Sequence, residues 1–206
     1  MSKLIVSLIL VIIGYISYRI TGLWLMMALI WNLFLALIPW GIFKIRQKVI
    51  HPFNYLLDII WLLFLPNSFY MFTDLTHISL LKMEILPTTV YETTTYIRDI
   101  PVYIAFTVII LFAVMGVYLG CFEMYERVSI EDKKIQKILY PILSLLCGIG
   151  IYIGRFLRFN SWDLLRPIYL MKTFLLSIDV FALFYIVLIS VLIYMTVMMY
   201  MQSSDR

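Results

Sequence analysis

Most of this chain consists of long apolar runs that are separated by short polar segments. Most of them approach or reach the roughly 17 to 25 residues that a helix needs to cross the hydrocarbon core of a bilayer. We therefore predict an all-α fold, a polytopic transmembrane helical bundle, with residues 1–206 in a single integral membrane domain. About six spans are expected, at residues 4–20, 22–43, 52–72, 100–122, 138–157 and 173–199.

Composition supports this assignment. Hydrophobic residues make up 64% of the chain and charged residues 14%, with a mean hydropathy of +0.99, whereas an average soluble domain is about one quarter charged. The net charge of +4 is spread over the loops, so we expect no nucleic-acid partner. The chain has no glycine-rich phosphate loop, nucleophile elbow or HExxH motif, and Cys121 and Cys147 stand alone in apolar runs. We expect no metal site and no cofactor.

The basic residues of the short loops predict the orientation. With the N-terminus inside, the loops on the cytoplasmic side are rich in Lys and Arg, and those outside are poor except for the segment after the fifth span. We therefore predict that both termini are cytoplasmic, in a bacterial cytoplasmic membrane. Arg155, Arg158 and Arg166 then lie outside against the positive-inside rule, which suggests a task there, such as binding phosphate or carboxylate.

A first polar stretch follows the third apolar run directly after Pro66. If the chain continues as a helix, residues spaced by three and four fall on one face. The candidate site residues of this stretch are Asn67, Tyr70, Thr73, Asp74 and His77. Asp74 and His77 would place a carboxylate beside an imidazole, as general acid–base catalysis requires. The same spacing also fits a helix that emerges into the interface and is hydrated by its own polar groups.

A second polar stretch follows the fifth apolar run. Two arginines just outside the hydrocarbon core suit bidentate contacts with phosphate or carboxylate groups. Arginines that extend to lipid phosphates and a tryptophan anchored at the interface would explain the same residues without a dedicated site. The candidate residues of this stretch are Arg155, Arg158, Asn160, Ser161, Trp162 and Asp163.

Two aspartates lie within the predicted spans. An ionisable residue inside a membrane is costly and indicates function by default. Asp58 lies toward the inner side of the third span and Asp179 toward the outer side of the sixth. The pairs Gly116 with Gly120 and Gly150 with Gly154 have the spacing of close helix packing.

The two polar stretches together resemble a family of multi-pass membrane proteins, domain of unknown function (DUF) 1361. The resemblance rests on Phe64-Leu65-Pro66-Asn67 with Tyr70, Thr73-Asp74-Leu75 and His77, and on Tyr152, Gly154-Arg155-Phe156-Leu157-Arg158 and Asn160-Ser161-Trp162-Asp163. It covers the chain from about Trp31 to the sixth span. Where the family has Trp-Tyr-Asp before the fourth span, this chain has Tyr96-Ile97-Arg98-Asp99, and Asp99 is the plausible match. The resemblance implies a multi-pass membrane protein and no particular activity.

Three functions follow from these candidates. In all of them we expect the two polar stretches to meet at the outer face of the membrane, with Asp99 close by. The first is a non-enzymatic protein whose outward-facing polar site binds an anionic lipid headgroup, an envelope precursor or a partner protein. The second is an enzyme that acts on a lipid-linked substrate with Asp74 and His77 as acid–base pair. The third is a small transporter that uses Asp58 and Asp179. Membrane lipids are the expected partners, with a protein partner or a homo-oligomer as further alternatives.

Overall fold

The computed structural model describes residues 2–49, 52–81, 84–85, 95–96, 99–159, 163 and 166–204. Its elements are the helices α1 (Ser2–Thr21), α2 (Leu25–Arg46) and α3 (Phe53–Thr73), a 3₁₀ helix η1 (Asp74–Leu81), the two-residue strands β1 (Glu84–Ile85) and β2 (Thr95–Tyr96), and the helices α4 (Ile100–Val128), α5 (Lys133–Phe156), α6 (Pro167–Leu176) and α7 (Val180–Ser204). Apart from the short antiparallel strand pair, the described fold is all-helical, as predicted.

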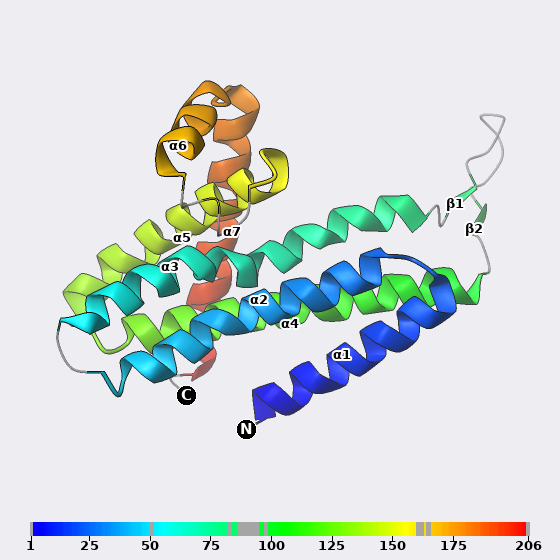
Figure 1. The fold of residues 1–206 in the computed structure, drawn as a ribbon, viewed down its shortest axis with the longest axis horizontal. Helices are drawn as coiled ribbons and strands as arrows, with labels where there is room; N and C mark the ends of the chain where they lie inside the picture. The colour runs from blue at the N-terminus through cyan, green and yellow to red at the C-terminus, as the bar shows by residue number, and fades with distance from the viewer. Residues whose placement is uncertain are drawn as a thin grey trace.

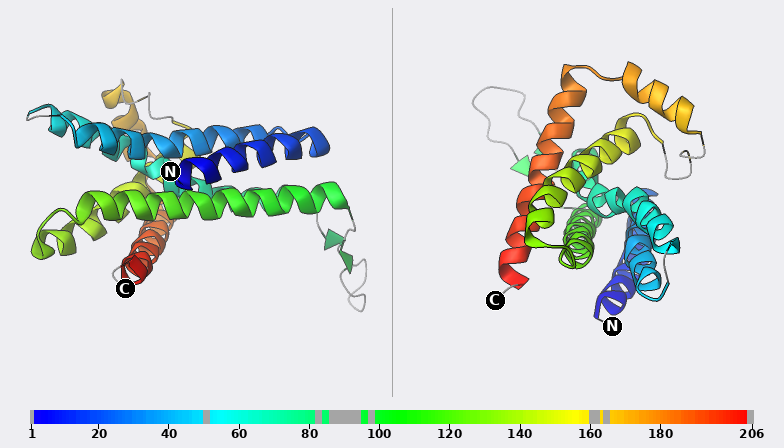
Figure 2. Two further views of the ribbon diagram at one scale, coloured as in Figure 1. Left: turned by 90° about the horizontal axis from the view of Figure 1, so that it is seen from below. Right: turned by 90° about the vertical axis from the view of Figure 1, so that its left-hand side faces the viewer.

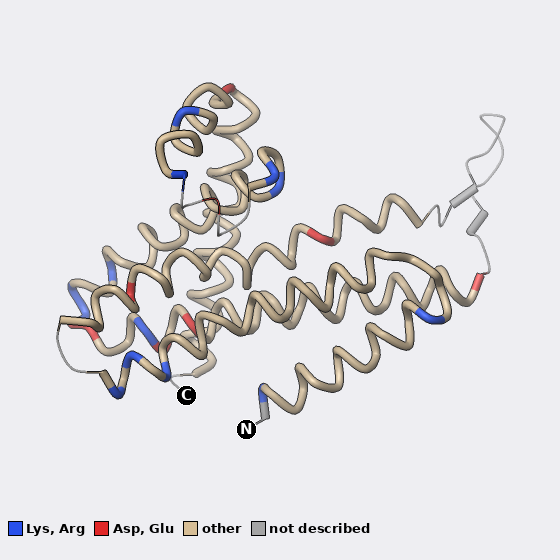
Figure 3. Tube along the Cα trace, viewed as in Figure 1, with Lys and Arg blue, Asp and Glu red and all other residues tan. Residues whose placement is uncertain are grey.

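Six of these helical segments are long and apolar enough to cross a membrane, in agreement with the predicted number of spans. The predicted third span, residues 52–72, nearly coincides with α3. The helices that flank the charged loop between α4 and α5 extend further than predicted: α4 continues to Val128 and α5 begins at Lys133. Charged residues gather at the helix ends and leave the middle of the long helices almost free of charge (Figure 3).

The predicted start of the sixth span is wrong, because this span is α7 and begins at Val180. The apolar run that begins at Thr173 is divided into α6 and α7, and α6 has only 10 residues, which corresponds to a length of about 15 Å and is too short to cross a bilayer. The chain breaks because Asp179 caps α7: its Oδ1 accepts a hydrogen bond of 2.7 Å from the backbone N–H of Ala182, as an N-cap residue does. Asp179 therefore lies before the span and is exposed.

The segment after α3 is a short helix of another type. The described part of this segment is the 3₁₀ helix η1, which follows α3 without a break at Asp74 and ends at Leu81. Pro66 does not interrupt α3, which continues through it to Thr73. Most of the chain between η1 and α4 lies outside the described residues.

Helix α4 forms the centre of the fold and packs against α1, α2, α3, α5 and α7. Helices α1, α2 and α4 run along the long axis of the molecule, while α7 crosses this direction steeply (Figures 1 and 2). Glycines permit the closest contact between α3 and α4, because a Cβ atom at Gly116 would lie 2.6 Å from the carbonyl oxygen of Ser68, and one at Gly120 would lie 2.7 Å from the ring of Phe69. This agrees with the packing role expected from their spacing.

Candidate functional site

The two polar stretches meet at the junction of α3 with η1, against the end of α5. Arg155, in the last turn of α5, donates hydrogen bonds from Nη1 to Asp74 Oδ1 (3.1 Å) and to the Tyr70 hydroxyl (3.3 Å). Its Nη2 donates to the Thr73 carbonyl oxygen (2.7 Å) and to the Thr76 hydroxyl. The guanidinium group of Arg155 therefore joins the end of α5 to the junction between α3 and η1. We call Tyr70, Thr73, Asp74, His77, Arg155 and Asn32 the arginine cluster.

Asp74 is the buried member of the cluster, with only 2% of the residue exposed. Its Oδ1 faces Arg155, and its Oδ2 accepts a hydrogen bond of 2.9 Å from the side-chain amide of Asn32 on α2. Because a buried carboxylate is costly unless it is paired and hydrogen-bonded, this double engagement explains why an aspartate is tolerated here. The pair of Asp74 and Arg155 carries no net charge.

His77 lies at the edge of the cluster. Its Nε2 is 3.8 Å from Asp74 Oδ1, which is an ion-pair distance but too long for a hydrogen bond. An acid–base function would require a closer contact between the two side chains. In this arrangement Asp74 orients Arg155 and Asn32.

Asn32 is a cluster residue that sequence reasoning missed. It stands 42 positions before Asp74, on a helix that was assigned only a membrane-spanning role. The signal was present, because a side-chain amide within an apolar span needs a hydrogen-bond partner. What the sequence could not supply was the identity of that partner.

A pocket of about 320 Å³ lies beside the cluster, between α2, α3 and α5, and Leu170 of α6 contributes to it. Its wall is mostly apolar. Three polar side chains reach it, those of Asn32, Asn67 and Tyr70, and two of these also bind the pair of Asp74 and Arg155. We call it the lateral pocket, and its remaining lining residues are Trp31, Leu35, Leu62, Leu63, Pro66, Leu146, Ile149, Gly150, Ile153, Gly154 and Phe159.

The other described candidates of the polar stretches lie outside the cluster. Asn67 lines the lateral pocket and donates from Nδ2 to the carbonyl oxygen of Phe64 (3.0 Å). Arg158 is exposed, with no ion pair or hydrogen bond to another described side chain, and has a left-handed backbone (φ 59°). Asp99 precedes α4 and shares none of the cluster's contacts. Asp163 is half-buried between α5 and α6, and Asn160, Ser161 and Trp162 lie outside the described residues.

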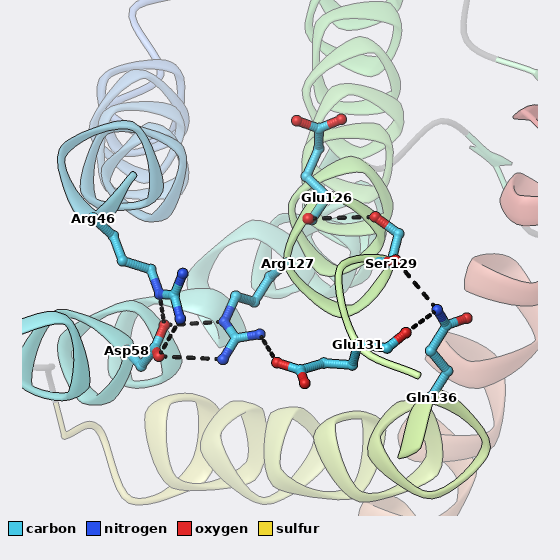
Figure 4. A network of polar contacts seen from close by, with 7 residues as sticks. All are labelled: Arg46, Asp58, Glu126, Arg127, Ser129, Glu131 and Gln136. Atoms are coloured by element: carbon cyan, nitrogen blue, oxygen red, sulfur yellow. Dashed lines mark hydrogen bonds and ion pairs between the residues drawn. The ribbon is translucent and has the colours of Figure 1, made fainter. Parts of the chain in front are cut away.

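Asp58, at the opposite end of α3, belongs to a separate group of charges (Figure 4). Its carboxylate accepts from Arg46 Nε (2.5 Å) on α2 and from Arg127 Nε (3.0 Å) on α4. Arg127 also binds Glu131 at 2.9 Å. We call Arg46, Asp58, Arg127 and Glu131 the charged clasp. Asp58 is therefore a paired residue close to a helix start, and Asp179 is a helix cap.

The described residues contain no group of three or more His, Cys, Asp or Glu side chains placed to hold a metal ion.

A comparison with protein families finds that residues 31–199 match the family described as a protein of unknown function, DUF1361. No curated protein and no solved structure matches the chain.

Proposed function

The chain belongs to the DUF1361 family, and we propose that it binds an amphiphilic molecule, a membrane lipid or a lipid-linked envelope precursor, in the lateral pocket. The membrane would be the bacterial cytoplasmic membrane, with the pocket toward its outer side. The observation that carries this proposal is the composition of the pocket wall. It combines a long apolar surface with three polar side chains that converge at the arginine cluster.

The apolar part of the wall suits a hydrocarbon chain. Leu62 and Leu63 of α3 face the pocket together with Ile149 and Ile153 of α5. A volume of about 320 Å³ is near the lower limit of ligand pockets, which span about 300 to 1,000 Å³. The pocket would therefore hold one part of an amphiphile, and the remainder would lie among the surrounding lipids.

The polar part of the wall suits a headgroup that forms hydrogen bonds. Asn32 and Tyr70 are held in place by Asp74 and Arg155, so they are already oriented before a ligand arrives. Such preorganisation lowers the entropic cost of binding. The charge of Arg155 is compensated by Asp74. Arg158, one residue before the pocket-lining Phe159, is exposed and has no ion pair with another described side chain, so its charge is available to a ligand. An anionic headgroup would be favoured there.

Binding is favoured over acid–base catalysis by the state of Asp74. Both of its oxygens are engaged, one by Arg155 and one by Asn32. Protonation of Asp74 would remove the charge that Arg155 compensates in this buried site, whereas ligand binding leaves the ion pair intact.

A pocket-filling substitution tests the proposal. Leu63→Trp places a large ring in the pocket at a position that is 37% exposed. The matched control is Leu56→Trp on the same helix, 57% exposed and outside the pocket wall. Native mass spectrometry of the detergent-purified proteins should show lipid retained by the wild type and the control and at least a fivefold loss in Leu63→Trp. Equal retention by all three proteins would contradict the proposal.

The headgroup is tested by adding back defined lipids. Phosphatidylglycerol, phosphatidylethanolamine and a polyprenyl phosphate are titrated separately into the delipidated protein. The proposal expects the two anionic lipids to bind more tightly than phosphatidylethanolamine, and expects Arg158→Gln to reduce that difference. Identical affinities for all three would remove the assigned role of Arg158.

A further inference from the structure

Glu123 is a buried acid that belongs to neither the arginine cluster nor the charged clasp. It lies on α4, and 2% of the residue is exposed. Its Oε2 is 2.8 Å from the hydroxyl oxygen of Ser68 on α3, which is fully buried. The same hydroxyl oxygen lies 3.1 Å from the carbonyl oxygen of Ala36 on α2. A short polar chain therefore runs from α4 through α3 to α2.

The hydrogen atoms available in this series of polar contacts determine whether Glu123 is protonated. A carbonyl oxygen only accepts hydrogen bonds, and a serine hydroxyl carries a single hydrogen. When Ser68 donates that hydrogen to Ala36, its 2.8 Å contact with Glu123 is a hydrogen bond only if Glu123 carries a hydrogen of its own. An ionised Glu123 would take the Ser68 hydrogen and leave the contact with Ala36 without one.

The surroundings of Glu123 favour the protonated, neutral form of its side chain. No lysine, arginine or histidine nitrogen of the described residues lies within 4.0 Å of its carboxyl group. Its Oε1 is buried and makes no hydrogen bond of normal geometry with a described residue, although the backbone N–H of Trp40 on α2 acts on the same carboxyl group. An unpartnered carbonyl oxygen of a neutral acid costs far less than an unpartnered oxygen of a carboxylate. Among the described residues, the titratable groups that act on Glu123 from neighbouring helices are Lys3 on α1 and Cys147 on α5.

We propose that Glu123 is a proton-binding site of the membrane domain, held as a neutral carboxylic acid that donates to Ser68 while Ser68 donates to Ala36. The bound proton completes a hydrogen-bonded chain across three helices. Loss of the proton would break one link and place a charge between α3 and α4, where Gly116 and Gly120 bring the helices into close contact. This assignment is independent of ligand binding in the lateral pocket.

Infrared spectroscopy of the wild-type protein in lipid bilayers tests the assignment. The carbonyl stretch of a protonated carboxylic acid is separate from the two stretches of a carboxylate. With ¹³C-labelled glutamate at neutral pH, the proposal expects a protonated-acid band that shifts with the label. Absence of that band from the wild type would overturn the proposal, whatever the behaviour of any variant.

Two variants test whether the protonated-acid band comes from Glu123. Glu123→Gln should abolish it and should remain folded, because the glutamine amide can donate to Ser68 as the neutral acid does. Ser68→Ala should move the band to higher frequency through loss of its hydrogen bond. The matched control is Glu131→Gln, which removes a carboxylate paired with Arg127 and should reduce only the carboxylate stretches. A band unchanged in both Glu123→Gln and Ser68→Ala would also overturn the proposal.

Discussion

The arginine cluster and the charged clasp use the same interaction at opposite ends of α3. Each pairs an aspartate of the α3 segment with an arginine, Asp74 with Arg155 and Asp58 with Arg46 and Arg127. Each also involves α2, through Asn32 in one case and Arg46 in the other. Their surroundings differ. The side chain of Asp58 is 19% exposed, that of Asp74 only 3%, and the lateral pocket adjoins the cluster.

This difference indicates that the charged clasp is a structural contact and that the arginine cluster has a functional role. The clasp contains two arginines for Asp58, plus Glu131, and lies where charged loops join the helices. It is redundant and partly exposed, as expected of a structural contact. The cluster has a single arginine, deeper burial and a neighbouring cavity. Ionic groups in such a position carry a larger penalty when they are disturbed, and their presence there suggests a role beyond stability.

The largest effect is expected from Arg155→Leu. It would leave Asp74 buried without a cationic partner, at a cost of about 3 to 5 kcal/mol in the free energy of unfolding. Reversible unfolding in mixed micelles measures this loss. The double variant Asp74→Leu with Arg155→Leu should be less destabilised than Arg155→Leu alone, since the unpaired charge is removed. If the double variant is the less stable of the two, Asp74 is not a buried charge that depends on Arg155.

A smaller effect is expected from Arg127→Leu in the clasp. Asp58 keeps Arg46 as a partner and remains partly exposed, so a loss of about 1 kcal/mol in unfolding free energy is expected. The same unfolding assay gives the comparison with Arg155→Leu. A loss in Arg127→Leu as large as that in Arg155→Leu would show that the two ion-pair groups are equivalent, and would contradict the distinction between cluster and clasp.

Arg158→Gly is expected to have the smallest effect, and of opposite sign. Arg158 adopts a left-handed backbone with φ 59°, which costs a residue other than glycine about 1 kcal/mol. The variant should gain up to that amount in unfolding free energy and lose the preference for anionic lipids. Arg158→Ala, which keeps the strain but removes the charge, is the matched control and should lose the preference with no gain in stability.

The sequence predicted the helices better than the residues they bring together. Spans depend on the length of apolar runs, so their number was correct, and the family resemblance was confirmed. The division of the sixth span was missed because the single polar residue Asp179 was taken as a residue inside a span, although aspartate is also a common N-cap. The orientation of the termini remains a prediction.

For the site, the sequence predicted that the two polar stretches would meet, and Asp74 and Arg155 do so. The partners of an intramembrane polar residue could not be derived from spacing. Asp58 was one of two residues of the transporter alternative. Its ion-pair partners Arg46 and Arg127 lie 12 and 69 positions away, on helices whose packing against α3 only the fold reveals. The role of Asn32 and the contact of Ser68 with Glu123 were not predicted for the same reason.

The most direct test of the distinction between the two ends of α3 is photo-crosslinking from that helix. A photoreactive phenylalanine analogue replaces Leu63 at the pocket or Leu56 near the clasp, and the protein is washed extensively in detergent before irradiation. We predict a lipid adduct at position 63 and none at position 56, detected by mass spectrometry of the intact protein. Equal adducts at both positions, or none at position 63, would contradict a binding site in the lateral pocket.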